Sequence, residues 1–241
     1  MSNPLEQFAI KKIVPLNING MDISFTNSSL CMLITVFVVF STLFWCLRKR
    51  NIIPSPAQSF AEMTYDFVTN IIGDTLGHDG YKYVALIFSI FTFIARGNLL
   101  GLFPYSFTFT SHLAAVGTLS LFCLILNIIF GLKHRGWDYF HTFFPKGVPW
   151  IMAPLIVPVE IFSLIGKSFS LTIRLVVNMS IGHIILKIIG TFIIAMKLFG
   201  FIPLFADMGI IMFELFVALL QAYIYTTLSC VYLSQSISEE E

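Results

Sequence analysis

Long runs of apolar residues constrain the fold of this chain more than any other feature of its sequence. The first, Ser29 to Leu47, has about 19 residues without a charge, and about 20 apolar residues span the hydrocarbon core of a bilayer as a helix. Further apolar runs cover residues 81–103, 113–132, 151–198 and 209–233. We therefore predict an all-α integral membrane protein with about five or six membrane helices.

The composition supports this class and excludes others. Only 11% of the residues are charged and 57% are hydrophobic, whereas a soluble domain carries roughly 25% charged residues. A soluble enzyme and a disordered regulator are therefore excluded. The net charge of +1 offers no basic surface for a polyanion, so nucleic acid is not an expected partner. The four cysteines lie far apart and form neither a metal-binding spacing nor a disulfide framework.

Basic clusters predict how the helices cross the membrane. Residues 48–50 are Arg-Lys-Arg directly after the first run, and residues 133–135, Lys-His-Arg, follow the third. By the positive-inside rule these ends face the cytoplasm or the matrix, and the N-terminal segment lies on the other side. No signal peptide is recognisable, so we expect insertion through the membrane helices themselves.

Residues 56–77 have the pattern of an amphipathic helix. The apolar residues near helical spacing are Phe60, Met63, Phe67, Ile71 and Leu76, and the acidic residues opposite them are Glu62, Asp66 and Asp74. This pattern predicts a helix lying at the membrane interface on the positive side. A helix packed on other parts of the protein explains the pattern equally well.

The run at residues 151–198 is too long for one upright span. As a continuous helix its roughly 48 residues would measure about 72 Å, against a hydrocarbon core of about 30 Å. The run therefore forms either two spans joined by a tight turn or a strongly tilted helix.

Ionisable side chains inside the apolar runs are the candidate functional residues. A charge at the bilayer centre costs about 2.5–3.5 kcal/mol on insertion scales, and such residues usually mark an ion or substrate path. Glu160, Arg174, His183 and Glu214 stand out by position. Arg96 is a fifth case, for which a structural role is the better interpretation.

Helical spacing relates these residues to one another. Arg174 and Asn178 are four apart and share a helix face, whereas His183 is nine residues from Arg174 and points to the opposite face. Glu214 and Gln221 are seven apart and begin a polar stripe on the last run. Because an isolated carboxylate in lipid would protonate, a stripe with a second polar group indicates a wet path.

Structural explanations compete with these functional ones. Arg174 could form an ion pair or extend to an interface, His183 could be a packing residue, and Glu160 could cap a helix. His183 and Glu214 are too few ligands for a metal site. No glycine-rich phosphate loop or nucleophilic triad occurs, so we expect no cofactor, no nucleotide site and no covalent chemistry in this chain.

Five sequence blocks carry a resemblance to a known family. In chain order they are NPLEQF (3–8), SFTNSSL (24–30), NLLGLFPYSFTFTSH (98–112), SLTIRLVVNMSIGHIILK (170–187) and LLQAYIYTTLSCVYL (219–233). Together they resemble subunit a of F-type ATP synthases (ATPase subunit 6 in mitochondria), in its mitochondrial or alphaproteobacterial form. The resemblance spans nearly the whole chain, and the order of the blocks makes it far more specific than a lone arginine.

The resemblance implies a proton-translocating stator subunit with two aqueous half-channels and an essential arginine facing a rotating ring of c subunits. Arg174 is similar in place to that arginine. The other proton-path positions fall on Glu160, Asn178, His183, Glu214 and Gln221.

The fold implied by the resemblance has two long, strongly tilted helices that pack on the c-ring. In this chain we expect a single membrane domain over residues 1–241. Its expected parts are a first transmembrane helix at 29–47, the amphipathic helix at 56–77, two further helices within 81–132, and a long helical hairpin carrying the proton path at 151–234.

The sequence departs from the family pattern at three places. Val176-Val177 replaces a pair such as Phe-Ala, Lys167-Ser168 replaces Arg-Pro, and Arg96 stands where an uncharged residue is usual. None of these departures falls on the six proton-path positions.

The resemblance also implies partners and a location. The partners are the c-ring, the peripheral stalk, other membrane-sector subunits and lipid, and the location is the mitochondrial inner membrane or, alternatively, a bacterial inner membrane. The competing interpretation is a secondary proton-coupled transporter or antiporter, but such proteins usually show an internal repeat and none is visible here. A purely structural scaffold leaves Arg174, His183 and Glu214 unexplained.

Overall fold

The chain folds into six long α-helices within the residues that the computed structural model describes, which are 12–15, 17–18, 21–22, 24–48, 51–102, 109–136, 152–196 and 200–237. The helices are α1 (Asn27–Leu47), α2 (Pro56–Leu76), α3 (Val84–Gly101), α4 (Leu113–Arg135), α5 (Ala153–Met196) and α6 (Phe201–Ile237), with short 3-10 segments at η2 (Gly77–Tyr83) and η3 (Phe109–Ser111). Five helical spans are long and apolar enough to cross a membrane, which confirms the predicted all-α membrane class. The first block of the resemblance, at residues 3–8, lies outside the described residues.

Two short strand pairs precede α1, where the sequence showed no β signature. β1 (Lys12–Val14) pairs antiparallel with β4 (Phe25–Thr26), and β2 (Asn17–Ile18) pairs antiparallel with β3 (Met21–Asp22). The strands have only two or three residues each, too few for the alternating pattern that identifies a strand in sequence. They bring the chain back to the start of α1, where the Thr26 side chain accepts a hydrogen bond from the Ser29 backbone N–H at 3.5 Å.

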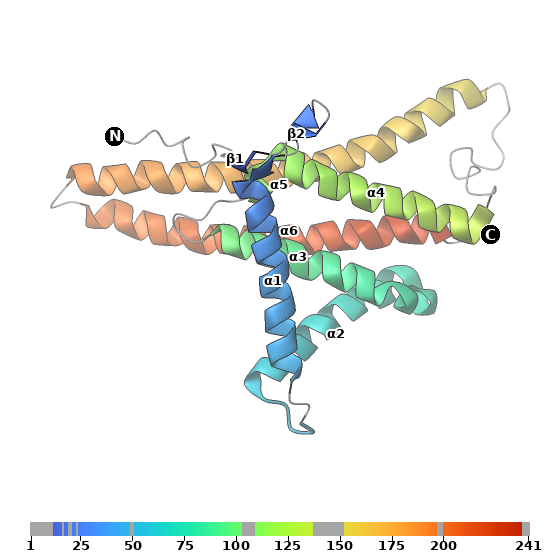
Figure 1. Ribbon diagram of the computed structural model, residues 1–241, viewed down its shortest axis with the longest axis horizontal. Helices are drawn as coiled ribbons and strands as arrows, with labels where there is room; N and C mark the ends of the chain where they lie inside the picture. Colours follow the sequence, from blue (N-terminus) through green and yellow to red (C-terminus); the bar gives the residue numbers. More distant parts are fainter. Residues whose placement is uncertain are drawn as a thin grey trace.

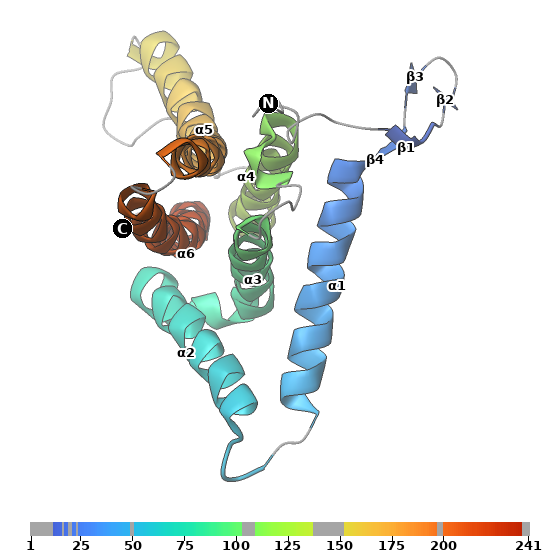
Figure 2. The same cartoon turned by 90° about the vertical axis from the view of Figure 1, so that its left-hand side faces the viewer.

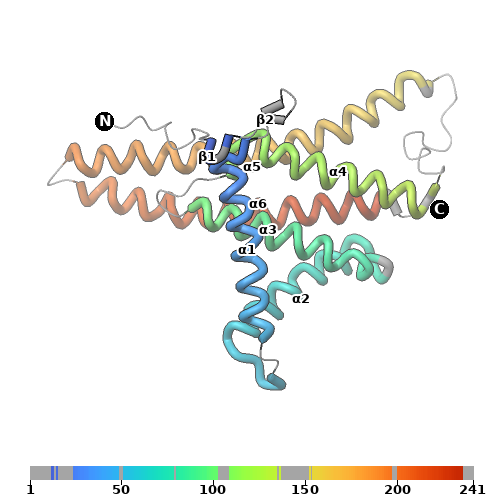
Figure 3. The backbone as a smooth tube through the Cα atoms, in the orientation of Figure 1, coloured from blue at the N-terminus to red at the C-terminus, as the bar shows by residue number. Residues whose placement is uncertain are grey.

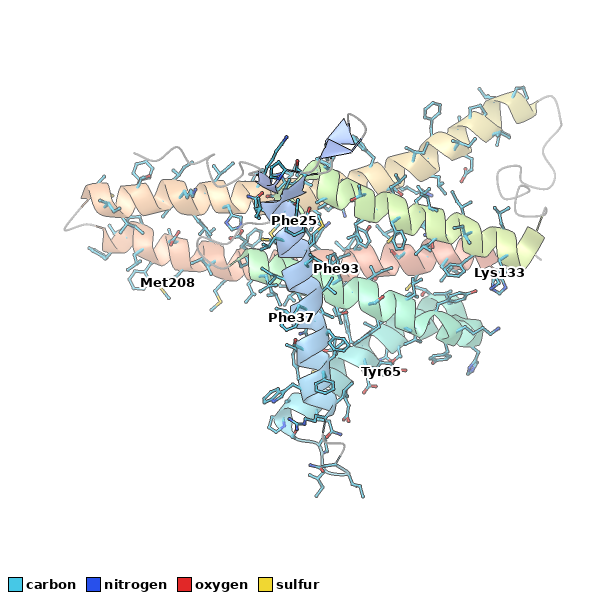
Figure 4. All side chains as sticks on the ribbon, viewed as in Figure 1. Phe25, Phe37, Tyr65, Phe93, Lys133 and Met208 are labelled. Atoms are coloured by element: carbon cyan, nitrogen blue, oxygen red, sulfur yellow. The ribbon has the colours of Figure 1, made fainter. Side chains whose placement is uncertain are left out.

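Helix α1 has the length of one upright membrane crossing. Its 21 residues measure about 32 Å, close to the thickness of the hydrocarbon core. Only Ser28 and Thr35 are buried in it, and large apolar side chains such as Phe37 point outward (Figure 4). An apolar helix exposed on nearly all sides is suited to contact with lipid.

The C-terminal part of α5 runs beside α6 along the longest axis of the molecule, while the N-terminal part of α5 bends away from that line (Figures 1 and 3). Both helices cross the direction of α1 at a steep angle. With 44 and 37 residues they measure about 66 and 56 Å, roughly twice a bilayer core. If α1 crosses upright, α5 and α6 must therefore lie strongly tilted. The alternative of two spans joined by a tight turn within 151–198 is wrong, because α5 continues unbroken to Met196 with Pro158 inside its first turns.

Helix α6 contacts α2, α3, α4 and α5, and one of its flanks faces away from the other helices (Figure 2). The main core joins α3, α4, α5 and α6 through buried side chains that include Ile94, Val116, Leu175, Ala222 and Tyr225. Small side chains on α6 let neighbouring helices approach closely, which matters in a membrane because apolar burial alone does not drive helices together there.

Helix α2 packs on protein, through a face that overlaps in part with the one that its sequence pattern indicated. Its buried residues are Gln58, Ala61, Val68, Ile71 and Ile72, and the last three of these belong to a second core with α3 and α6. Of the predicted apolar face, Ile71 is buried and the Phe67 ring lies against Phe91 and Tyr223, whereas Phe60 and Met63 are exposed. Part of the apolar surface of α2 therefore remains available for lipid or another subunit.

We predict that enlarging Ala222 will destabilise the bundle. Ala222 is completely buried on α6, so Ala222→Leu overpacks the core and should lower the free energy of unfolding by about 1–3 kcal/mol. Ala206→Leu is the matched control, because Ala206 is exposed on the same helix and should change stability by less than about 0.5 kcal/mol. Unfolding by SDS in mixed micelles measures both, and equal midpoints would contradict the packing described here.

Candidate functional site

Polar side chains of α6 are buried along one face of the helix. Glu214 is 6% exposed and Gln221 is 1% exposed, while Ala218 between them is also buried. The predicted stripe therefore points into the bundle and not towards lipid. A carboxylate and an amide at such positions require polar neighbours or water, because an unpaired buried polar group costs about 1–3 kcal/mol.

Asn98 on α3 is a polar partner that the sequence analysis missed. It is fully buried, and its Nδ2 donates a hydrogen bond to the Ala218 backbone carbonyl at 3.1 Å. Residue 98 is a neutral amide two positions after Arg96 in the apolar run at 81–103. An asparagine in an apolar run is the signal that could have found it, since polar side chains commonly link membrane helices.

Asn98, Asn178, Glu214 and Gln221 line one small cavity between α3, α5 and α6. Its volume is about 10 Å³, about the space that one water molecule needs. Asn98 Oδ1, both carboxylate oxygens of Glu214 and both side-chain polar atoms of Gln221 have no hydrogen-bond partner among the described residues. These converging polar atoms can hold water, and the Glu214 carboxylate can exchange protons with it. We call this space the Glu214 cavity.

Gly182 on α5 makes room for the Glu214 side chain. A Cβ atom added at residue 182 would collide with the Glu214 carboxylate, whereas one added at Gly190 on the same helix would meet nothing within 4 Å. The closest approach of α5 and α6 at this level therefore depends on a residue without a side chain.

Arg174 lies on the exposed face of α5, in an open groove of about 520 Å³ between α5 and α6. Lys167 is the second cation in this groove, and no acidic residue lines it within the described part of the chain. Asn178, one helical turn beyond Arg174, lines the Glu214 cavity instead. The two residues predicted to share a face thus border two different spaces.

Glu160 lines a third space, a cavity of about 50 Å³ between α4, α5 and α6 that we call the Glu160 cavity. Its other polar lining residues are Ser120, Asn127, Lys167, Ser168, Tyr225, Ser229, Tyr232 and Gln235. On one wall Ser120 Oγ and Thr172 Oγ1 form a hydrogen bond of 2.5 Å that joins α4 to α5. The cavity is polar enough to hold water beside the carboxylate.

His183 lies apart from the two cavities. Its side chain is hydrogen-bonded to the backbone of Gly101, at the end of α3. His183 directly follows Gly182, the residue that contacts Glu214, yet it does not line the Glu214 cavity. The structure brings Asn178, Glu214 and Gln221 together, places Arg174 and Glu160 in adjoining spaces, and leaves the pairing of His183 with Glu214 a prediction.

Comparison with known proteins identifies the family of the chain. A family model described as ATP synthase A chain matches residues 29–234. The chain belongs to the ATP synthase subunit a family. It is 45% identical over 240 residues to ATP synthase subunit a of Rhodospirillum rubrum, covering 99% of both chains. It is 42% identical over 240 residues to that of Ehrlichia ruminantium, with 99% of both covered, and 40% identical over 242 residues to that of Mesorhizobium japonicum, with 98% and 96% covered.

Membership of the subunit a family confirms the predicted function. The chain is the proton-translocating subunit of the ATP synthase membrane sector, and the transporter or antiporter interpretation has no support. These relatives come from alphaproteobacteria. They support a bacterial inner membrane as the location and do not confirm the predicted mitochondrial one.

We predict that Gly182→Ala will impair proton-driven ATP synthesis while the protein still assembles. The added methyl group must displace the Glu214 carboxylate, and a shift of about 1 Å in a working group can cost tenfold or more in rate. Gly190→Ala is the matched control, since it makes the same helical substitution in open space and should leave the rate unchanged. Equal rates for the two variants in assembled complexes would show that the contact with Glu214 is unimportant.

Proposed function

We propose that this chain conducts protons through two half-channels that meet at Arg174 and open to opposite sides of the membrane. The observation that carries this proposal is that the Glu160 cavity and the Glu214 cavity share no lining residue. Arg174 lies between Glu160 and Asn178 along α5 and faces the exterior of the bundle. A proton moving from one cavity to the other must therefore leave this chain and be carried by a partner.

The inner half-channel would contain Glu160. The Glu160 cavity adjoins the groove of Arg174, so a proton released near Arg174 can reach the carboxylate through polar surroundings. Its far end lies towards the start of α5 and the end of α6. We place it on the side of the basic clusters at residues 48–50 and 133–135, which by the positive-inside rule is the cytoplasm of a bacterium.

The outer half-channel would contain Glu214, with Gln221 and Asn178 beside it and His183 nearby. Glu214 and Gln221 lie two helical turns apart on the same buried face, and their unpartnered polar atoms favour a bound water molecule in the Glu214 cavity. His183 can exchange protons near neutral pH, which suits a residue that transfers protons to Glu214.

Arg174 would separate the two half-channels by charge. An arginine remains positively charged at any accessible pH, so it repels a proton moving directly past it and attracts an ionised carboxylate of the partner. The groove that holds Arg174 has cations and no acidic residue among the described residues, which suits a carboxylate brought by a partner. Direct leakage would dissipate about 2.3 kcal/mol per proton for each 100 mV.

The partner facing Arg174 would be the ring of c subunits. Arg174 stands within an exposed apolar stripe on α5 that includes Ile173, Val177, Ile181, Ile188 and Phe192. Such a surface suits an apolar helical ring turning in the membrane. Peripheral-stalk and other membrane-sector subunits, together with lipid, would cover the remaining exposed surface of α1 and α2, and the complex would lie in a bacterial inner membrane as a multi-pass assembly.

We predict that Arg174→Ala will abolish coupled ATP synthesis in a complex that still assembles. Loss of the fixed charge should lower the synthesis rate by at least about 100-fold, while passive proton conduction through the membrane sector persists or rises. Arg96→Ala is the control, because Arg96 is also an arginine within an apolar helix but lines none of the three spaces, and it should keep synthesis within about twofold. Full synthesis by assembled Arg174→Ala complexes would refute this mechanism.

We also predict that His183 and Glu214 act together. If they pass protons to each other, a double-mutant cycle of His183→Ala and Glu214→Ala on proton-driven synthesis should show a coupling of about 1 kcal/mol or more. The control cycle combines Glu214→Ala with His134→Ala, a histidine exposed at the end of α4, and should be additive. Additive losses in both cycles would exclude the pairing of His183 with Glu214.

A further inference from the structure

Four side chains separate the groove of Arg174 from the Glu160 cavity. Lys167, Leu171, Tyr232 and Gln235 line both spaces, two from α5 and two from α6. A proton that moves between the Arg174 groove and Glu160 must therefore pass these residues. Lys167 is the cation in this shared wall.

The ammonium group of Lys167 lies over the ring of Tyr232. The Nζ atom is 5.8 Å from the ring centroid, within the range of a cation–π interaction. Lysine is otherwise a flexible side chain that extends into water. The Tyr232 ring of α6 thus holds the ammonium group of Lys167 at the boundary between the groove of Arg174 and the Glu160 cavity.

Lys167 and Glu160 occupy the same face of α5. They are seven residues apart, two helical turns or about 10 Å along the axis, and both line the Glu160 cavity. The other titratable lining residues are Cys123 from α4 and Tyr225 and Tyr232 from α6, and Arg174 lies beyond the wall in the groove. Within the described lining of the Glu160 cavity, Lys167 is thus the one basic residue and Glu160 the one acidic residue.

We propose that Lys167, held over Tyr232, is a gating residue of the inner half-channel, whose charge keeps an excess proton from resting between the groove of Arg174 and the Glu160 cavity. This inference rests on the proposed role of Glu160. The cation repels a proton that would otherwise remain in the shared wall, so protons are delivered and not stored.

The test uses the complete ATP synthase complex in lipid vesicles. Proton-driven ATP synthesis is measured against the pH on the side where ATP forms, with the total driving force held constant by a potassium gradient. Lys167→Met removes the charge at similar volume, so protons should leave the wall only at lower proton concentration and the pH of half-maximal synthesis should rise. Lys167→Arg keeps a cation that can stack on Tyr232 and should restore the original pH profile.

Matched controls isolate the charge and the ring. Lys133→Met removes a lysine that is exposed near the end of α4 and lines neither space, and it should leave the profile unchanged (Figure 4). Tyr232→Leu removes the ring that holds Lys167 and should shift the profile in the same direction as Lys167→Met.

The outcomes distinguish a failure of this inference from a failure of the proposed function. If Glu160→Gln slows synthesis but Lys167→Met leaves the pH profile unchanged, the gating role is wrong and the inner half-channel stands. If Glu160→Gln has no effect in assembled complexes, the inner half-channel itself is wrong and the gating role is lost with it. Equal losses in Lys167→Met and Lys167→Arg, without a shift in pH, would show that Lys167 acts through packing and would overturn the proposal.

Discussion

The burial of Glu214 and Gln221 between α5 and α6 is the interaction on which the rest of the structure depends. Polar atoms at membrane depth need partners, because an unsatisfied group in an apolar medium costs several kcal/mol. The chain gathers polar side chains from three helices around one small cavity, including Asn98 from α3, and water in this cavity can supply the partners that their polar atoms lack within the protein. Gly182 and Ala218 keep the helices close enough for that cavity to stay small.

The same arrangement keeps the two carboxylates apart. Between the Glu160 cavity and the Glu214 cavity lies the main apolar core, in which Leu171, Leu175, Ala222 and Tyr225 are buried. Water cannot cross such a packed region easily, so the direct route through the protein is closed. The length of α5 makes this separation of Glu160 from Glu214 possible. Glu160 and Gly182, the α5 residue beside Glu214, lie about 33 Å apart along the helix axis.

The exposed apolar surface of the chain explains its composition. Helix α1 is almost unburied, and large apolar side chains such as Phe162 on α5 and Phe216 on α6 are exposed. Surfaces of this kind in water would mark an aggregating protein, whereas in a membrane they contact lipid or other subunits. The low charge content reflects this environment and the assembly in which family members work.

The sequence by itself determined the class, the approximate spans and the family of this protein. A run of about 20 uncharged residues forms a helix in lipid. Charged residues inside such runs are rare, so Arg174 and Glu214 could be recognised from the sequence. Only the tertiary structure decided which of these residues meet. Asn98 joins the site because α3 crosses α6 at Ala218, and Lys167 stands between the groove of Arg174 and the Glu160 cavity, with its ammonium group over Tyr232 from another helix. The buried face of α2 was also set by its neighbours, since several of its faces carry apolar residues and periodicity alone could not select one. Contacts between helices depend on crossing geometry, which local spacing does not encode.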